Sequence, residues 1–148
     1  MDTTTQTVYY VCLFSRGSTA VTWQFRDSVL VITLVGKYSF EEPIQAVTDA
    51  IGDPQFHPGT SLLFDSRKSE AKRSAEDVRA RAHWMVSLVP QGISARFAIV
   101  ISSQLHQYGL ARMLGIHLDL QGLILGIFTD FEEAMRWLTA KAAQANGN

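Results

Sequence analysis

The strongest constraint on the fold is a regular alternation of short apolar runs with longer stretches whose apolar residues recur at helical spacing. Four compact runs read as strands, at 29–35, 62–64, 97–101 and 123–128. Strands that alternate with helices form a mostly parallel sheet joined by right-handed crossovers. The sequence therefore predicts one α/β domain, with helices flanking its sheet.

An opening hairpin adds one antiparallel strand to this sheet. Val21, Trp23 and Phe25 alternate with polar residues, which is the period-two pattern of a half-buried strand. Only the short turn at 26–28 separates this strand from the apolar run at 29–35, so the two are predicted to pair. The predicted order is β-β-α-β-α-β-α-β-α, in a mixed, mostly parallel sheet.

Each predicted helix has a start signal. The first is expected to begin at Ser39, with Glu42 completing a capping box, or at Glu42, followed by Pro43. Ser74 with Asp77 caps the second helix, Ser102-Ser103 the third, and Asp130 with Glu133 the last. Each helix is also predicted to turn an apolar face inward. In chain order, these faces are Ile44, Val47 and Ile51 in the first helix; Ala75, Val78, Ala82, Met85, Val86 and Val89 in the second; Leu105, Tyr108, Ala111 and Leu114 in the third; and Ala134, Trp137 and Leu138 in the last. Gly109 lies inside the third helix, where a glycine indicates close packing.

Length and charge limit the functional classes. The 148 residues are 47% apolar and 18% charged, as expected for one globular domain. We place the domain at 19–140, with an extension at 1–18 that could add a strand, and a tail at 141–148. A net charge of −1 indicates no attraction to nucleic acid. No apolar run suits a membrane span or a signal peptide, so a cytoplasmic location is expected.

Familiar catalytic and metal-binding patterns are missing from the sequence. A single cysteine, Cys12, forms neither an intramolecular disulfide nor a cysteine cluster, and the four histidines lack metal-ligand spacing. There is no Gly-x-Ser-x-Gly elbow, no phosphate-binding Gly-x-x-x-x-Gly-Lys loop and no Gly-x-Gly-x-x-Gly fingerprint. We therefore expect no metal, no cofactor and no enzymatic activity.

The polar junction that follows the run at 62–64 is the predicted functional site, because ligands of α/β proteins bind beyond the carboxyl ends of the strands. The candidate binding residues are Asp65, Ser66, Arg67, Ser69, Lys72 and Arg73. Six of the thirteen basic residues fall within the fifteen positions 67–81. These charges, with the first amides of the helix that Ser74 opens, could hold an anion. The alternative is an ordinary solvated surface, neutralised by neighbouring acidic residues.

Positions distributed along the chain resemble those of a known family. They are Gly36; Pro54, Phe56, Pro58 and Gly59; Leu63, Phe64, Asp65 and Arg67; Arg96, Ala98, Ile99 and Val100; 108–113; and Phe128, Thr129, Asp130, Ala134, Trp137 and Leu138. Over roughly 19–140 the pattern resembles the small bacterial SpoIIAA-like proteins of STAS/SEC14 type. The resemblance implies a four-turn β-α superhelix.

The resemblance also carries two functional precedents. Anti-sigma-factor antagonists of this fold are non-enzymatic, protein-binding switches controlled by serine phosphorylation, for which Ser66 and Ser69 are the candidates here. Ser74 is at the same junction but reads better as a helix cap. The Asp-Ser-Ser/Thr-Gly pattern typical of those antagonists is absent. Lipid-transfer domains of a related fold hold hydrophobic ligands instead.

Three functional hypotheses follow. The first is a non-enzymatic STAS-like regulatory module that binds a protein partner or a second copy of itself, through apolar strips that include Trp84 and Leu88, or Tyr108, Met113 and Ile116. The second is a carrier of a small amphipathic, lipid-like ligand, with its apolar body between helices and its anionic head near Arg67, Lys72 and Arg73. The third is an enzyme built around Asp65, Ser66 and Arg67.

Overall fold

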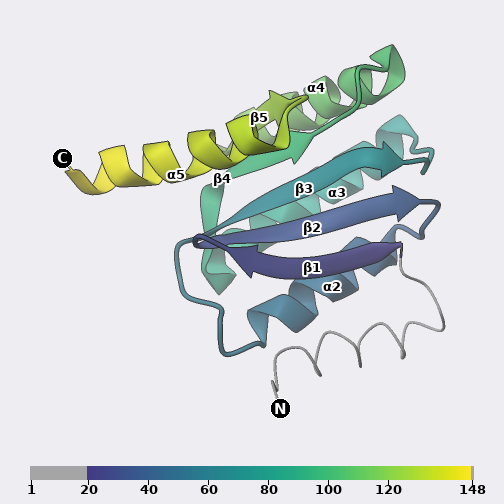
Figure 1. The fold of residues 1–148 in the computed structure, drawn as a ribbon. Coiled ribbons are helices and arrows are strands. Elements are labelled where there is room, and N and C mark those ends of the chain that lie inside the picture. Colours follow the sequence, from purple (N-terminus) through teal and green to yellow (C-terminus); the bar gives the residue numbers. More distant parts are fainter. Residues whose placement is uncertain (1–19, 148) are drawn as a thin grey trace.

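The computed structural model describes residues 20–147, and the side chains of residues 20–140 (Figure 1). The predicted extension at 1–18 lies outside the described residues. Five strands form one sheet in the order β1-β2-β3-β4-β5. They are β1 Val21–Arg26, β2 Val29–Gly36, β3 Thr60–Ser69, β4 Ile93–Val100 and β5 Ile124–Phe128. β1 is antiparallel to β2, and the other three pairings are parallel, which confirms the predicted mixed sheet.

The hairpin between β1 and β2 turns on Asp27 and Ser28, which have φ angles of 50° and 66°. Two-residue hairpins favour positive φ at both central residues because the resulting twist matches that of the strands. The register pairs Arg26 with Val29 and continues to Val21 with Leu34. The turn predicted at 26–28 is confirmed.

Helices cover both faces of the sheet. The helices are α2 Glu41–Ile51, α3 Ala75–Leu88, α4 Leu105–Asp119 and α5 Phe131–Gly147, with a short 3₁₀ turn η1 at Val89–Gln91. In Figure 1, α2, α3 and α4 lie behind the sheet and α5 lies in front of it. The last residues of α5 include positions that the sequence assigned to a tail.

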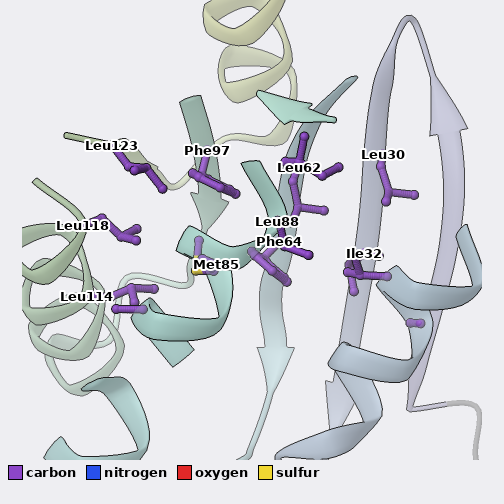
Figure 2. Close-up of a cluster of buried hydrophobic side chains, with 14 of the residues drawn as sticks. Leu30, Ile32, Leu62, Phe64, Met85, Leu88, Phe97, Leu114, Leu118 and Leu123 are labelled. Atoms are coloured by element: carbon purple, nitrogen blue, oxygen red, sulfur yellow. The ribbon is translucent and has the colours of Figure 1, made fainter. Parts of the chain in front are cut away.

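Two hydrophobic clusters fill the space between sheet and helices. The larger cluster lies between the sheet and α2, α3 and α4; Figure 2 shows its central residues. They are Leu30, Ile32, Leu62, Phe64, Met85, Leu88, Phe97, Leu114, Leu118 and Leu123. The smaller cluster packs the opposite face of the strands, including Leu63 and Ala98, against Ala134 and Leu138 of α5. Successive strand residues thus enter opposite clusters, which explains the almost continuous apolar runs.

The capping signals predicted for α2 and α3 agree with the structure. The cap predicted at Ser102-Ser103 is wrong, because the N-cap of α4 is Gln104, which makes no side-chain capping bond. Ser74 and Asp77 form a reciprocal capping box, with bonds of 3.1 Å from Asp77 N to Ser74 Oγ and 3.0 Å from Ser74 N to Asp77 Oδ2. Ser39 and Glu42 make the equivalent pair of bonds, although α2 begins at Glu41. At α5, the Asp130 carboxylate accepts a bond from the amide of Glu132.

The predicted buried face of α4 was wrong in its first turn. Leu105 is 86% exposed and Tyr108 is 46% exposed, whereas Ala111, Leu114 and Leu118 are buried. One helical turn before Ala111, the residue on the same face is Gln107 rather than Leu105 or Tyr108. Gly109 is exposed, and a Cβ added there would meet nothing within 4 Å, so the expected close packing is also absent.

Smaller corrections apply to the other helices on this face of the sheet. Ile44 and Ile51 of α2 are only half-buried, since the helix buries Pro43, Ala46, Val47 and Ala50 instead. In α3, Leu88 belongs to the core rather than to a separate strip, and Ala75 is exposed. Apolar periodicity located both helices. It displaced the buried face of α2 by about one residue, and it placed Val78, Ala82 and Met85 of α3 correctly.

Strand β3 is longer than its apolar run predicted. It continues through Asp65 to Ser69, with Val35 of β2 paired to Lys68 and Gly36 to Ser69. One extra residue on β3 shifts the register between Thr33 and Val35, as in a β-bulge. The first half of the predicted junction is therefore strand and not loop.

Candidate functional site

A cavity of about 140 Å³ lies at the carboxyl ends of β2, β3 and β4, beside α2, α3 and α4. Its apolar walls include Phe64 and Ile99 from the sheet and Leu110 and Leu114 from α4. Its polar groups come mainly from the end of β3 and the first turns of α3 and α4. The cavity thus lies where parallel α/β sheets bind their ligands.

Arg81 of α3 brings a partly buried positive charge to this cavity. Its Nη2 donates to the Phe40 carbonyl at 2.9 Å, and its guanidinium lies 4.1 Å from the Phe40 ring centroid and 5.2 Å from that of Trp84. Its Nη1 is buried and has no hydrogen-bond partner within the described residues. Burial, with a further contribution from the charge of Arg73, lowers the pKa of Arg81 to about 10.

Arg73 supplies a second cation to the cavity lining. Its Nη2 donates to the Tyr38 carbonyl at 2.9 Å, and its guanidinium lies 5.2 Å from the Tyr38 ring centroid. The Tyr38 hydroxyl forms a 2.7 Å hydrogen bond with Ser69 Oγ. Within residues 20–140, neither Arg73 nor Arg81 has a carboxylate partner at ion-pair distance. The cavity therefore carries positive charge that no acidic side chain pairs directly.

Gln107 connects the first turn of α4 to the end of β3. Its Nε2 donates to the carbonyls of Ser66 and Ser69, both at 3.2 Å. Its Oε1 accepts bonds from the amide and the hydroxyl of Ser102, at 2.8 and 3.0 Å. These four hydrogen bonds tie the first turn of α4 to the end of β3 at the cavity wall.

The predicted site residues divide into three groups in the structure. Ser66, Ser69 and Arg73 line the cavity, whereas Lys72 is exposed and does not. Asp65 and Arg67 line a second hollow, between the ends of β2 and β3. There the Arg67 guanidinium lies 5.5 Å from the ring centroid of Phe131 of α5.

This division weakens the enzyme hypothesis. Adjacent strand residues point to opposite faces of the sheet, and Ser66 enters the cavity on the side of α2, α3 and α4. Asp65 and Arg67 do not line that cavity, so the three residues do not converge on one reacting centre. Of the two serines considered for phosphorylation, Ser66 is buried and Ser69 is partly exposed.

Asp65 and Arg67 form a bidentate ion pair, with Nε–Oδ1 and Nη2–Oδ2 distances of 2.9 and 2.8 Å. Burial alone would raise the pKa of Asp65. The side-chain and backbone hydrogen bonds from Arg67, with the charges of Arg67 and Lys68, outweigh burial and lower the pKa below its ordinary value. The pair fixes the end of β3 on the face opposite the cavity.

Replacing Arg67 with glutamine is expected to raise the pKa of Asp65 above its ordinary value, because burial then acts unopposed by the ion pair. In the native protein, the stability that the pair contributes is present above the unfolded-state pKa of about 3.9 and is lost as the pH falls through the lower folded-state pKa. A ¹³C NMR titration of the Asp65 carboxyl group measures the shift. Lys68→Gln is the matched control and should move this pKa much less; an unchanged Asp65 pKa in Arg67→Gln would contradict the assignment.

Sequence reasoning missed Tyr38 and Gln107 as site residues and counted Arg81 only within a basic cluster. A signal for Arg81 was present, since it lies three residues after Val78 and four before Met85, on the buried face of α3. Tyr38 and Gln107 carry no comparable local signal. Their roles depend on hydrogen bonds across 31 to 41 positions of the chain.

The five-stranded mixed sheet, with its antiparallel edge strand and helices on both faces, is a SpoIIAA-like fold. One similar solved structure is an uncharacterized protein of the DUF3478 family with a SpoIIAA-like fold, from Shewanella loihica PV-4. It is 17% identical, with a TM-score of 0.53 over 80% of this chain and 92% of that one. Another is an anti-sigma factor antagonist from Mycobacterium paratuberculosis, 15% identical, with a TM-score of 0.56 over the same shares of the two chains. These likenesses confirm the predicted fold class.

No family model and no curated protein matches the sequence of this chain. Across residues 20–147, no helix is both long and apolar enough to cross a membrane. The same part of the chain contains no group of three His, Cys, Asp or Glu residues placed to hold a metal ion. The cavity beside Arg73 and Arg81 is thus the best-defined site that the structure offers.

Proposed function

We propose that the protein is a non-enzymatic, STAS-like regulatory module that acts by binding another protein. The observation that carries this proposal is the outer face of α4. Leu105, Tyr108 and Ile116 lie at intervals close to whole helical turns and are 86%, 46% and 57% exposed, and Leu120, just beyond the helix, is 76% exposed. Similarity in fold to an anti-sigma factor antagonist agrees with a role in protein binding.

This exposed apolar row, defined as Leu105, Tyr108, Ile116 and Leu120, has the dimensions of a helix-binding surface. Fifteen residues of helix rise about 22 Å. The exposed Arg112 lies within the row, between Tyr108 and Ile116, with its guanidinium 5.9 Å from the Tyr108 ring centroid. Ile124 of the edge strand β5 is also 47% exposed, and β5 packs against α4. The proposed partner presents an apolar helix or groove; a second copy of this chain is the alternative occupant.

Replacing Ile116 with glutamate is expected to weaken the association at least tenfold while leaving thermal stability nearly unchanged, because this exposed side chain contributes little to the core. A photo-crosslinking residue at position 116, compared with one at the exposed position Ala80 of α3, identifies the partner in cells. Sedimentation equilibrium then distinguishes a second copy from a different protein.

Crosslinks to one protein that depend on position 116, together with lost binding in Ile116→Glu, would support the proposal. Equal crosslinking from positions 116 and 80, or association unaffected by Ile116→Glu, would remove α4 as the partner surface. Circular dichroism of each variant confirms that the comparison is made between folded proteins.

A second function, binding of a small amphipathic ligand, is favoured by one specific observation: the apolar cavity beside Arg73 and Arg81. Most of its exposed lining is apolar, and its polar groups come mainly from the end of β3 and from α3 and α4. A concave apolar site with a few convergent polar groups is the usual form of a small-molecule site. Ligand-induced shifts of the Ile99 and Leu110 methyl resonances test this function directly.

A further inference from the structure

We infer that the cavity binds a small amphipathic carboxylate, with the carboxylate hydrogen-bonded to Arg81 and the apolar body packed against Phe64, Ile99 and Leu110. This inference rests on the proposed ligand-binding function and names the class of ligand. The sequence-based expectation placed the anionic head near Arg67, Lys72 and Arg73. Of these three residues, only Arg73 lines the cavity.

The first argument is an unsatisfied donor. Buried side-chain nitrogen atoms almost always have a hydrogen-bond partner, yet Nη1 of Arg81 is buried without one among the described residues. The other side of the same guanidinium is fixed by Nη2 on the Phe40 carbonyl and by stacking on the Phe40 ring. Arg81 is therefore held in a set orientation beside the cavity, with its Nη1 lacking a hydrogen-bond partner among the described residues.

The second argument is unbalanced charge. Arg73 and Arg81 both line the cavity, and among the described residues of that lining Asp77 is the only acidic one. Its Oδ2 already accepts the amide hydrogen of Ser74 in the capping box of α3. A partly buried cation without a carboxylate partner is costly, and an anion from outside the chain would relieve that cost.

The third argument is the size and character of the remaining space. The cavity volume of about 140 Å³ is close to the roughly 150 Å³ of an engineered apolar cavity that binds benzene. An apolar body of about six to eight carbon atoms fits such a space. A planar carboxylate suits the fork of a guanidinium, which favours bidentate geometry over a single point contact.

Pairs of ligands that share one carbon skeleton but end in a carboxylate or in a neutral hydroxymethyl group test the inference. Phenylacetate is compared with 2-phenylethanol, and hexanoate with 1-hexanol, by calorimetry and by methyl NMR of the full chain. We expect each carboxylate to bind at least tenfold more tightly than its alcohol. That preference should be lost in Arg81→Met, partly kept in Arg81→Lys and unchanged in Arg79→Met, which alters an exposed arginine of the same helix.

The outcomes separate failure of the inference from failure of the proposed function. Equal affinity for acid and alcohol would overturn the carboxylate assignment and leave ligand binding intact. Tighter binding of phenyl phosphate than of phenylacetate would replace carboxylate by phosphate ester. No shift at Ile99 or Leu110 with any of these compounds at millimolar concentration would overturn both. Thermal unfolding of each variant shows that lost binding does not reflect a lost fold.

Discussion

Replacing Arg81 with methionine is expected to raise the free energy of unfolding by about 1–2 kcal/mol. The lowering of the Arg81 pKa to about 10 means that the folded protein destabilises the charged form of this side chain by roughly 3 kcal/mol. Methionine removes that cost and fills the space with an unbranched apolar side chain. The lost hydrogen bond to Phe40 and the lost stacking on its ring offset part of the gain.

Thermal and chemical unfolding measure this effect, which should appear as a rise of roughly 3–6 °C in melting temperature. Arg79→Met is the control, since Arg79 is exposed, and its melting temperature should stay within about one degree of the native value. A fall in stability for Arg81→Met would mean that Arg81 is structural. A rise in stability, together with loss of the preference for carboxylates over alcohols, would show that Arg81 serves ligand binding and lowers the stability of the fold.

Replacing Gly126 with alanine is expected to lower the free energy of unfolding by about 1–3 kcal/mol. Gly126 lies in the middle of β5, and a Cβ there would stand 2.7 Å from Phe128 Cε2 and 2.9 Å from Trp137 Cζ3. Those rings are themselves packed, with centroids 5.5 Å apart, and the guanidinium of Arg96 lies 4.1 Å from the Trp137 ring centroid. A methyl group must displace at least one ring of this stack.

Urea unfolding followed by tryptophan fluorescence gives the loss in stability, and near-ultraviolet circular dichroism reports displacement of Trp137. Gly115→Ala in α4 is the matched control because its Cβ would make only ordinary contacts, at 3.8 Å and beyond, with Leu125. Because alanine has a higher helix propensity than glycine, Gly115→Ala is expected to leave the free energy of unfolding unchanged or to raise it slightly. If Gly126→Ala and Gly115→Ala had the same free energy of unfolding, the rings of Phe128 and Trp137 would be shown to move aside without cost.

Much of the fold could be predicted because its signals are local. The capping pair of Ser74 and Asp77 lies within one helical turn, and the apolar runs around Leu62 and Phe97 need only a buried strand to explain them. The extension of β3 through Lys68 gave no such signal. Those polar residues belong to the sheet because their backbone pairs with β2. Backbone pairing does not depend on side-chain hydropathy, so the hydropathy pattern could not predict it.

The site was only partly predictable, for two physical reasons. The strand pleat separates Ser66 from Asp65 and Arg67, although the three are consecutive in the sequence. The burial of Arg81 depends on Phe40, which lies 41 positions earlier and meets α3 only in the folded chain. A cluster of basic residues in the sequence therefore indicated the correct region, but not which side chains share a cavity.

Helix α4 stands between the two proposed binding surfaces, and this position has a thermodynamic consequence. Its inner face carries Gln107, Leu110 and Leu114 of the cavity wall, while its outer face carries Leu105 and Ile116 of the exposed apolar row. A short helix moves as one body, so a ligand that shifts α4 changes the surface that a partner meets. If such coupling exists, it must be reciprocal: the factor by which the ligand changes partner affinity equals the factor by which the partner changes ligand affinity.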